Sequence, residues 1–164
     1  MEFKETFQYP ASIDRVWEML SDPEYAADRA KELRITAPSV DSDAHENKVI
    51  RTTTGGIPQD EIPAAVKKFI SPSAKATLKE VWERHGNERI SGRIEVSAQG
   101  VPAHLNAHME LAGKSDVTDV TMRGELRVNI PLLGRRLEKE AIGAAPLLAK
   151  AEVENAQKWL AAHK

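Results

Sequence analysis

The sequence predicts an α+β fold in which one antiparallel sheet is covered by a long C-terminal helix. Three observations predict it. Four consecutive strand-like runs between residues 74 and 129 alternate apolar and polar residues and are joined by short turns. Two short amphipathic segments follow the first strand-like run, and residues 131–163 have helical periodicity. A sheet with one apolar face needs a cover, and only the last segment is long enough to supply it.

The first half of the chain alternates between strand and helix signals. Residues 1–9 alternate apolar and charged side chains and end at Pro10, which predicts a strand. Ser12 is a favoured N-cap, and the apolar spacing after it predicts a short helix that stops before Asp22 and Pro23. The elements expected next are a helix over 24–33, a strand over 33–40, a turn over 41–47, a strand over 48–54 closed by Gly55-Gly56, and a loop with a short helix over 57–70.

The four later strands have one apolar and one polar face. They are expected over residues 74–85, 88–99, 103–112 and 117–129. Their separators are short and rich in turn residues, so neighbouring strands should be antiparallel. The inward positions include the small residues Gly92, Ala107 and Gly124.

The C-terminal segment carries one broad apolar arc with small residues at its middle. Ala141, Ala144 and Ala145 lie where a filled core would favour Leu or Ile. Small residues allow either close packing of helix against sheet or space for a ligand. The small residues on the facing strands favour space for a ligand. Pro146 interrupts the segment and puts a straight helix in doubt.

Composition excludes several classes of function. The 164 residues include 41% hydrophobic and 29% charged residues, with a formal charge of −2 and no cysteine. This balance predicts one domain over residues 1–164, without the basic excess of a nucleic-acid-binding protein. The lack of cysteine excludes thiolate metal sites and thiol nucleophiles. No apolar run has the length of a signal peptide or a transmembrane helix, so we expect a cytoplasmic protein.

Few residues suggest catalysis or metal binding. Glu80 and Arg84 flank Trp82 on one strand face, and Glu152 lies near the centre of the helix arc unless a kink at Pro146 turns it to solvent. These three are weak candidates for acid or base work. His104 and His108 lie about 13 Å apart on a strand, too far for one zinc ion, so we expect neither a metal nor a cofactor.

The chain resembles the START-like superfamily, which includes the birch-pollen-allergen family and polyketide cyclases. The opening FQYPASIDRVWEMLSDPEY at residues 7–25, Trp82, and IPLLGRRLEKE at residues 130–140 are similar to a bacterial family of unknown function within it. The resemblance covers the whole chain. It implies the helix-grip fold, with a curved sheet wrapped around the last helix and a cavity between them. It implies no shared catalytic residue.

The sequence therefore predicts a carrier or sensor of a small hydrophobic molecule, such as a lipid, sterol-like or polyketide-like compound. The alternatives are an enzyme like a polyketide cyclase or dehydratase, and a protein-interaction domain with a filled core. Residues 66–70 are a candidate gate. The residues expected to line the cavity are Trp17, Phe69, Trp82, Ile94, Val96, Leu105, Ala107, Met109, Met122, Leu126, Leu137, Ala141, Ala144 and Leu148.

Overall fold

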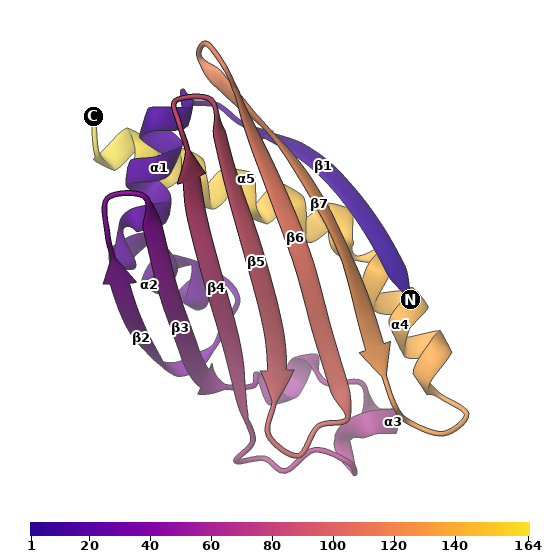
Figure 1. Cartoon of the computed structure of the whole chain (residues 1–164). Helices are drawn as coiled ribbons and strands as arrows, with labels where there is room; N and C mark the ends of the chain where they lie inside the picture. The colour runs from indigo at the N-terminus through magenta and orange to yellow at the C-terminus, as the bar shows by residue number, and fades with distance from the viewer.

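The computed structural model describes residues 1–164 as one seven-stranded sheet with helices on one face (Figure 1). The strand order is β1-β7-β6-β5-β4-β3-β2, and every neighbouring pair is antiparallel. The strands are β1 Glu2–Tyr9, β2 Thr36–Ala44, β3 Lys48–Gly56, β4 Lys75–His85, β5 Arg89–Ala98, β6 Ala103–Lys114 and β7 Val117–Val128. The helices are α1 Ile13–Ser21, α2 Pro23–Glu32, α3 Ala64–Lys67, α4 Gly134–Gly143 and α5 Ala145–Ala162, with a 3-10 turn at Gln59–Glu61.

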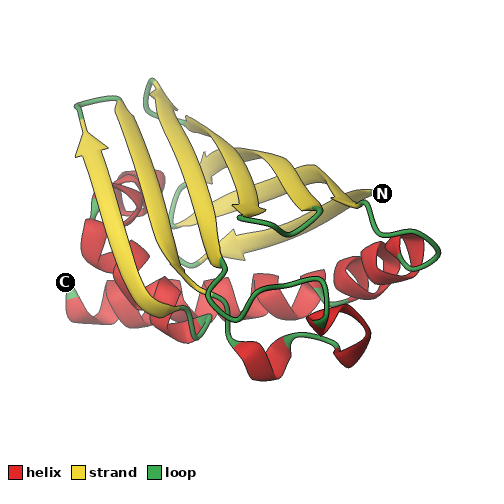
Figure 2. Ribbon diagram, turned by 90° about the horizontal axis from the view of Figure 1, so that it is seen from below, coloured by secondary structure: helices red, strands yellow, loops and turns green.

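The sheet curves over the helices, as Figure 2 shows from below. α5 packs mainly against β1 and also touches α1 and α2, while α4 packs against β7. The predicted helix-grip architecture is therefore confirmed. The cover of the sheet is shared, however, because α1 contacts β5, β6 and β7, and α2 contacts β2.

The closing segment is divided into two helices at the proline that put a straight helix in doubt, and α5 is the longer of the two. Ala144 is both the C-cap of α4 and the N-cap of α5, and Pro146 lies in the first turn of α5. Proline lacks the backbone N–H and its ring clashes with the preceding turn of a helix, but it fits well at a helix start. The break lies beside the small residues Ala144 and Ala145.

The expected strand over 33–40 and turn over 41–47 were misplaced. β2 continues to Ala44 and pairs with β3, so only residues 45–47 form the turn. β2 is an edge strand whose polar side chains are mostly exposed, which is why polarity suggested a turn. Gly55 and Gly56 belong to β3 rather than to a turn, and a Cβ on Gly55 would lie 2.2 Å from Ile35 Cγ2.

Two apolar clusters hold the layers together. The main one joins α1, α5 and the sheet and includes Trp17, Trp82 and Trp159. The second is formed by Ile62, Val66 and Ile130 at the other end of the molecule.

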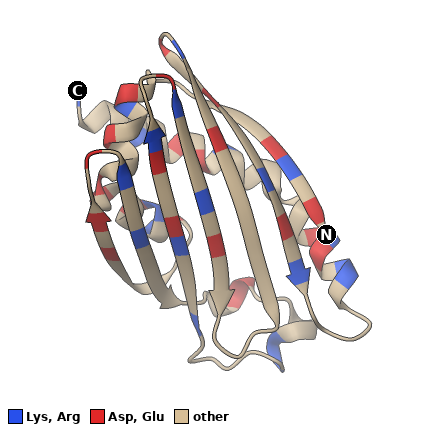
Figure 3. Ribbon diagram, viewed as in Figure 1, with Lys and Arg blue, Asp and Glu red and all other residues tan.

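Charged residues of both signs recur along the strands (Figure 3). His104 and His108 are exposed on the polar face of β6, as the strand alternation predicts. No helix is long and apolar enough to cross a membrane.

Candidate ligand-binding cavity

A cavity of about 320 Å³ lies between the sheet and the junction of α4 and α5. We call it the larger cavity, to distinguish it from a smaller apolar cavity beside it. Of the 17 residues that line it, 15 are hydrophobic. They are Phe3, Ala76, Ile94, Val96, Ser97, Ala98, Val101, Ala103, His104, Leu105, Ala107, Met122, Leu126, Ala141, Ile142, Ala145 and Leu148.

The cavity exists because small side chains face one another across the two layers. Ala141 and Ala145 come from the helices, and Ala107 comes from β6. The cavity lies at the level of Ala141 to Leu148, where the small side chains gather. At about 30 Å³ per water molecule, it has room for roughly ten waters. Nearly all of its wall offers no hydrogen-bond partner, so it suits an apolar guest better than water.

The structure places eight of the fourteen predicted lining residues in the wall of the larger cavity. They are Ile94, Val96, Leu105, Ala107, Met122, Leu126, Ala141 and Leu148. The other six lie elsewhere. Trp17, Trp82 and Met109 belong to the main core cluster, and Leu137 packs on the second cluster.

Ala144 and Phe69 also lie outside the wall. Ala144 joins the two helices, and Phe69 is exposed beside Lys68. Val66 of the candidate gate is buried with Ile62 and Ile130, and none of residues 66–70 lines the cavity.

Several lining residues were missed. Phe3, Ala76 and Ala98 share the inward phase of their strands, so strand alternation contains a signal for them. Val101 lies in a turn, where no periodicity applies.

Two inward glycines do not create space. A Cβ on Gly92 would lie 2.4 Å from the Trp82 ring, and one on Gly124 would lie 2.7 Å from the Phe3 ring. These glycines admit aromatic rings from the neighbouring strands. The interpretation of both as part of an open space was therefore wrong, whereas Ala107 does face the cavity.

A smaller cavity of about 120 Å³ lies between α2 and strands β3 to β5. It shares Ala76 and Val96 with the larger cavity, so the two are adjacent. Its lining includes the polar residues Arg29, Thr53 and Thr77, but nearly all of its wall is apolar. The full lining is Ala26, Arg29, Ala30, Leu33, Ile35, Thr53, Gly55, Ala76, Thr77, Leu78 and Val96.

Beside the smaller cavity lies a group of charged side chains that we call the buried charge cluster: Arg29, Arg51, Glu80 and Glu152. Arg29 Nη2 donates to Glu80 Oε1 at 2.7 Å, and its Nη1 lies 3.8 Å from Glu152 Oε1. Burial alone would lower the pKa of Arg29, but the two carboxylates outweigh it and hold that pKa above its ordinary value. Arg51 donates to the Leu20 carbonyl at 2.8 Å. Its burial lowers its pKa.

Two tyrosines bind the carboxylate of Glu152. Tyr9 Oη donates to Glu152 Oε1 at 3.0 Å, and Tyr25 Oη donates to the same oxygen. Burial, followed by the negative charge of Glu152, raises the pKa of both tyrosines well above the ordinary value of 10.0. The break at Pro146 therefore does not turn Glu152 to solvent, since this side chain faces the interior.

The three weak catalytic candidates fall in two places. Glu80 and Glu152 lie in the buried charge cluster, where Glu80 Oε1 also accepts from Trp82 Nε1 at 3.3 Å. Arg84 instead pairs with Asp14 near the end of β4. None of the three lines the larger cavity. Sequence reasoning missed Arg29, because it lies among charged residues of α2 that suggest a solvated helix face.

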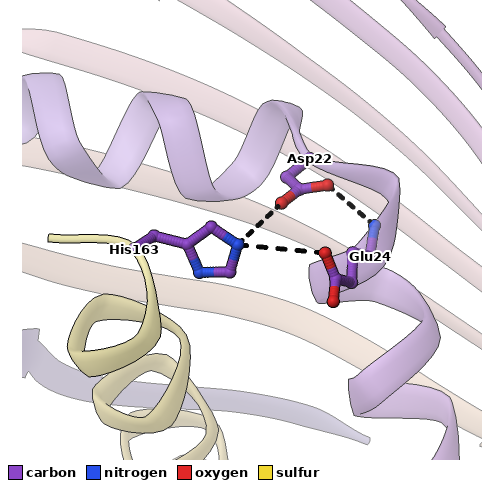
Figure 4. A group of neighbouring side chains, drawn as sticks. All are labelled: Asp22, Glu24 and His163. Carbon is purple, nitrogen blue, oxygen red and sulfur yellow. Dashed lines mark hydrogen bonds and ion pairs between the residues drawn. The ribbon is translucent and has the colours of Figure 1, made fainter.

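Asp22, Glu24 and His163 form a separate polar group, which joins the end of α5 to the start of α2 (Figure 4). His163 Nε2 lies 3.8 Å from both Asp22 Oδ2 and Glu24 Oε2. Asp22 also accepts from the Glu24 backbone N–H and from Trp159 Nε1, each at 2.9 Å. The group therefore fastens the C-terminal turn to the helix pair.

The curved antiparallel sheet and the closing helices define a protein of the helix-grip fold. More narrowly, the chain belongs to the family described as protein of unknown function DUF2505, whose model matches residues 4–160. A search of curated proteins finds no match.

Solved structures of low sequence identity share this fold. The protein TTHA0849 from Thermus thermophilus is 16% identical, with a TM-score of 0.59 and 100% of both chains covered. Norcoclaurine synthase from Thalictrum flavum, in complex with dopamine and hydroxybenzaldehyde, is 13% identical, with a TM-score of 0.56, 100% of this chain and 88% of that chain covered. The di-domain ARO/CYC BexL is 14% identical, with a TM-score of 0.57, 96% of this chain and 49% of that chain covered.

Proposed function

We propose that this protein binds a small hydrophobic molecule in the larger cavity and acts as a cytoplasmic carrier or sensor of it. The observation that carries the proposal is the wall of the cavity, in which 15 of 17 residues are hydrophobic around about 320 Å³. This volume is near the lower end of the range of about 300–1,000 Å³ for small-molecule sites. Norcoclaurine synthase, which shares the fold, holds small aromatic molecules and supports the same use here.

The test places a large side chain on α5, so that it fills the cavity from the helix side. Ala145 is 8% exposed and lines the cavity, whereas Ala151 of the same helix is exposed. We expect the natural sequence to bind the neutral fluorescent probe N-phenyl-1-naphthylamine and to retain a lipid after incubation with a lipid extract. Ala145→Phe should weaken probe binding at least tenfold, and the matched control Ala151→Phe should leave it unchanged.

Stability separates an open cavity from close packing. Overpacking a filled core costs about 1–3 kcal/mol. If the space is open, Ala145→Phe should change the free energy of unfolding by less than this. Absence of probe and lipid binding, or unchanged binding by Ala145→Phe, would contradict the proposal.

A second candidate is an enzyme like a polyketide cyclase or dehydratase. It is favoured by the position of Glu80 and Glu152 beside the smaller cavity and by the shared fold of the ARO/CYC BexL. Incubation with a poly-β-ketone thioester should then give a dehydrated ring, and Glu80→Gln or Glu152→Gln should abolish it. Unchanged substrate, recovered bound to the protein, would favour the carrier.

A further inference from the structure

Asp22, Glu24 and His163 bring three side chains of metal-binding type together between the start of α2 and the end of α5. Figure 4 shows them pointing toward one another, and one ligand atom from each lies within 4.8 Å of the other two. His163 Nε2 is 3.8 Å from an oxygen of each carboxylate, beyond the range of about 2.7–3.2 Å for an N–H···O hydrogen bond. The imidazole therefore faces both carboxylates without a hydrogen bond to either.

Contacts with Trp159 fix the orientation of the His163 ring. His163 Nδ1 lies 2.8 Å from the Trp159 carbonyl oxygen, which can only accept, so Nδ1 carries the proton of the neutral ring. The two rings are also stacked, with their centroids 4.1 Å apart. In the neutral ring the lone pair is therefore on Nε2, the nitrogen that faces Asp22 and Glu24.

Trp159 supports Asp22 as well. Its indole Nε1 donates to Asp22 Oδ2 at 2.9 Å. A metal-binding histidine almost always donates its second ring N–H to a carbonyl, a carboxylate or water, and metal-binding carboxylates are themselves hydrogen-bonded. Trp159 is not part of the group and is buried, and it makes both supporting bonds, one with its carbonyl and one with its indole.

The charges and the distances indicate which cation fits. No lysine or arginine forms a salt bridge with Asp22 or Glu24, so a divalent cation would neutralise two otherwise uncompensated carboxylates. An ion between the three atoms would lie within about 2.5 Å of each, and zinc bonds to nitrogen and oxygen measure about 2.0–2.2 Å. A small movement of the exposed Glu24 side chain closes this gap. Imidazole favours Zn²⁺ over Mg²⁺ and Ca²⁺, which prefer oxygen ligands.

We propose that Asp22, Glu24 and His163 bind one divalent transition-metal ion such as Zn²⁺, which joins the end of α5 to the start of α2. This inference goes beyond the proposed function, because none of the three residues lines either cavity. The sequence predicted no metal site because the three ligands come from distant parts of the chain.

Calorimetric titration of the full chain with ZnCl₂, at neutral pH in a buffer that does not bind zinc, tests the inference. We expect one Zn²⁺ per chain, and MgCl₂ and CaCl₂ should bind at least a hundredfold more weakly. Zinc should also raise Tm, because a cation that binds only the folded protein stabilises it. His163→Gln should weaken zinc binding at least tenfold and abolish the rise in Tm.

His45→Gln is the matched control. His45 is also an exposed histidine beside a carboxylate, with Nε2 3.2 Å from Asp43 Oδ2, but it has only this one acidic partner. Its replacement should leave zinc binding unchanged. Glu24→Gln alters a side chain that is exposed in the fold, and it should also weaken zinc binding at least tenfold. Absence of zinc binding, unchanged binding by His163→Gln, or an equal loss in His45→Gln would overturn the inference and leave the group as an ion pair only.

Discussion

At the residue scale, Tyr9 and Tyr25 are the only tyrosines in the chain, and both donate to one oxygen of Glu152. Their neutral forms are favoured in the fold because burial and the carboxylate oppose a phenolate. They join β1 and α2 to α5. The hydrogen bonds of the two tyrosines to Glu152 thus help to position β1 and α2 against α5.

This arrangement predicts a loss of stability at alkaline pH. In the unfolded chain both tyrosines release their protons near pH 10, whereas in the fold their pKa values are higher. The stabilisation is therefore fully present below about pH 10 and is lost as the pH rises toward the folded pKa values. Thermal unfolding followed at increasing pH should show Tm falling above about pH 10.

The tyrosinate absorbance provides the control, because no other tyrosine contributes. In the native protein it should appear only together with unfolding. Tyr9→Phe should make the alkaline fall in stability shallower, and at neutral pH it should cost about 1–3 kcal/mol because Glu152 loses a donor. An ordinary titration near pH 10 in the folded protein would show that the tyrosines are not held by Glu152.

At the element scale, Asp22 is in contact with three helices. It is the C-cap of α1 and the N-cap of α2, and its carboxylate also accepts from Trp159 of α5. One residue therefore links α1, α2 and α5.

Replacement of Asp22 should destabilise the protein more than replacement of a neighbouring acidic residue. Asp22→Ala removes an N-cap, worth about 0.5–2 kcal/mol, and the hydrogen bond from the buried indole of Trp159. We expect a loss of about 2 kcal/mol in the free energy of unfolding, measured by urea denaturation. The control Glu24→Ala removes an exposed carboxylate that lies 3.8 Å from His163 Nε2, and it should change the free energy of unfolding by less than about 1 kcal/mol. Equal losses for both variants would contradict the role assigned to Asp22.

At the scale of the whole molecule, the first and last strands pair directly, and the two edges of the sheet differ. β1 is covered by α5, whereas most of β2 is exposed. Most strand residues that line the larger cavity come from β4 to β7, which lie in the interior of the sheet, and Phe3 of the edge strand β1 also lines it. The cavity is thus built mainly on strands with two neighbours each.

Hydrogen exchange in the native state should follow this arrangement. Amides of β6, paired on both sides, should be the most protected, and those of β2 should exchange fastest among the strands. The measurement is amide exchange followed by mass spectrometry or NMR. Equal protection of β2 and β6 would indicate that the sheet opens only as a whole.

The sequence by itself determined the order of the elements and the faces of the strands. Ile94, Val96, Leu105 and Ala107 follow a period of two, which is a property of the local chain. The small residues at 141–145 likewise identified the level of the cavity. Element bounds failed at β2, where edge pairing overrode local polarity, whereas Pro146 correctly marked the interruption of the closing segment.

Only the tertiary structure decided which side chains meet. Glu80 and Glu152 stood out in the sequence, but their contact partners did not. These partners are Arg29 and Tyr25 of α2 and Tyr9 of β1. Tyr9 and Glu152 are 143 positions apart, and no local pattern encodes such a contact. The same holds for Gly92, whose missing side chain makes room for Trp82 rather than for a ligand. Periodicity predicts a face, because it is local, whereas a cavity and the buried polar contacts near it depend on how distant elements pack.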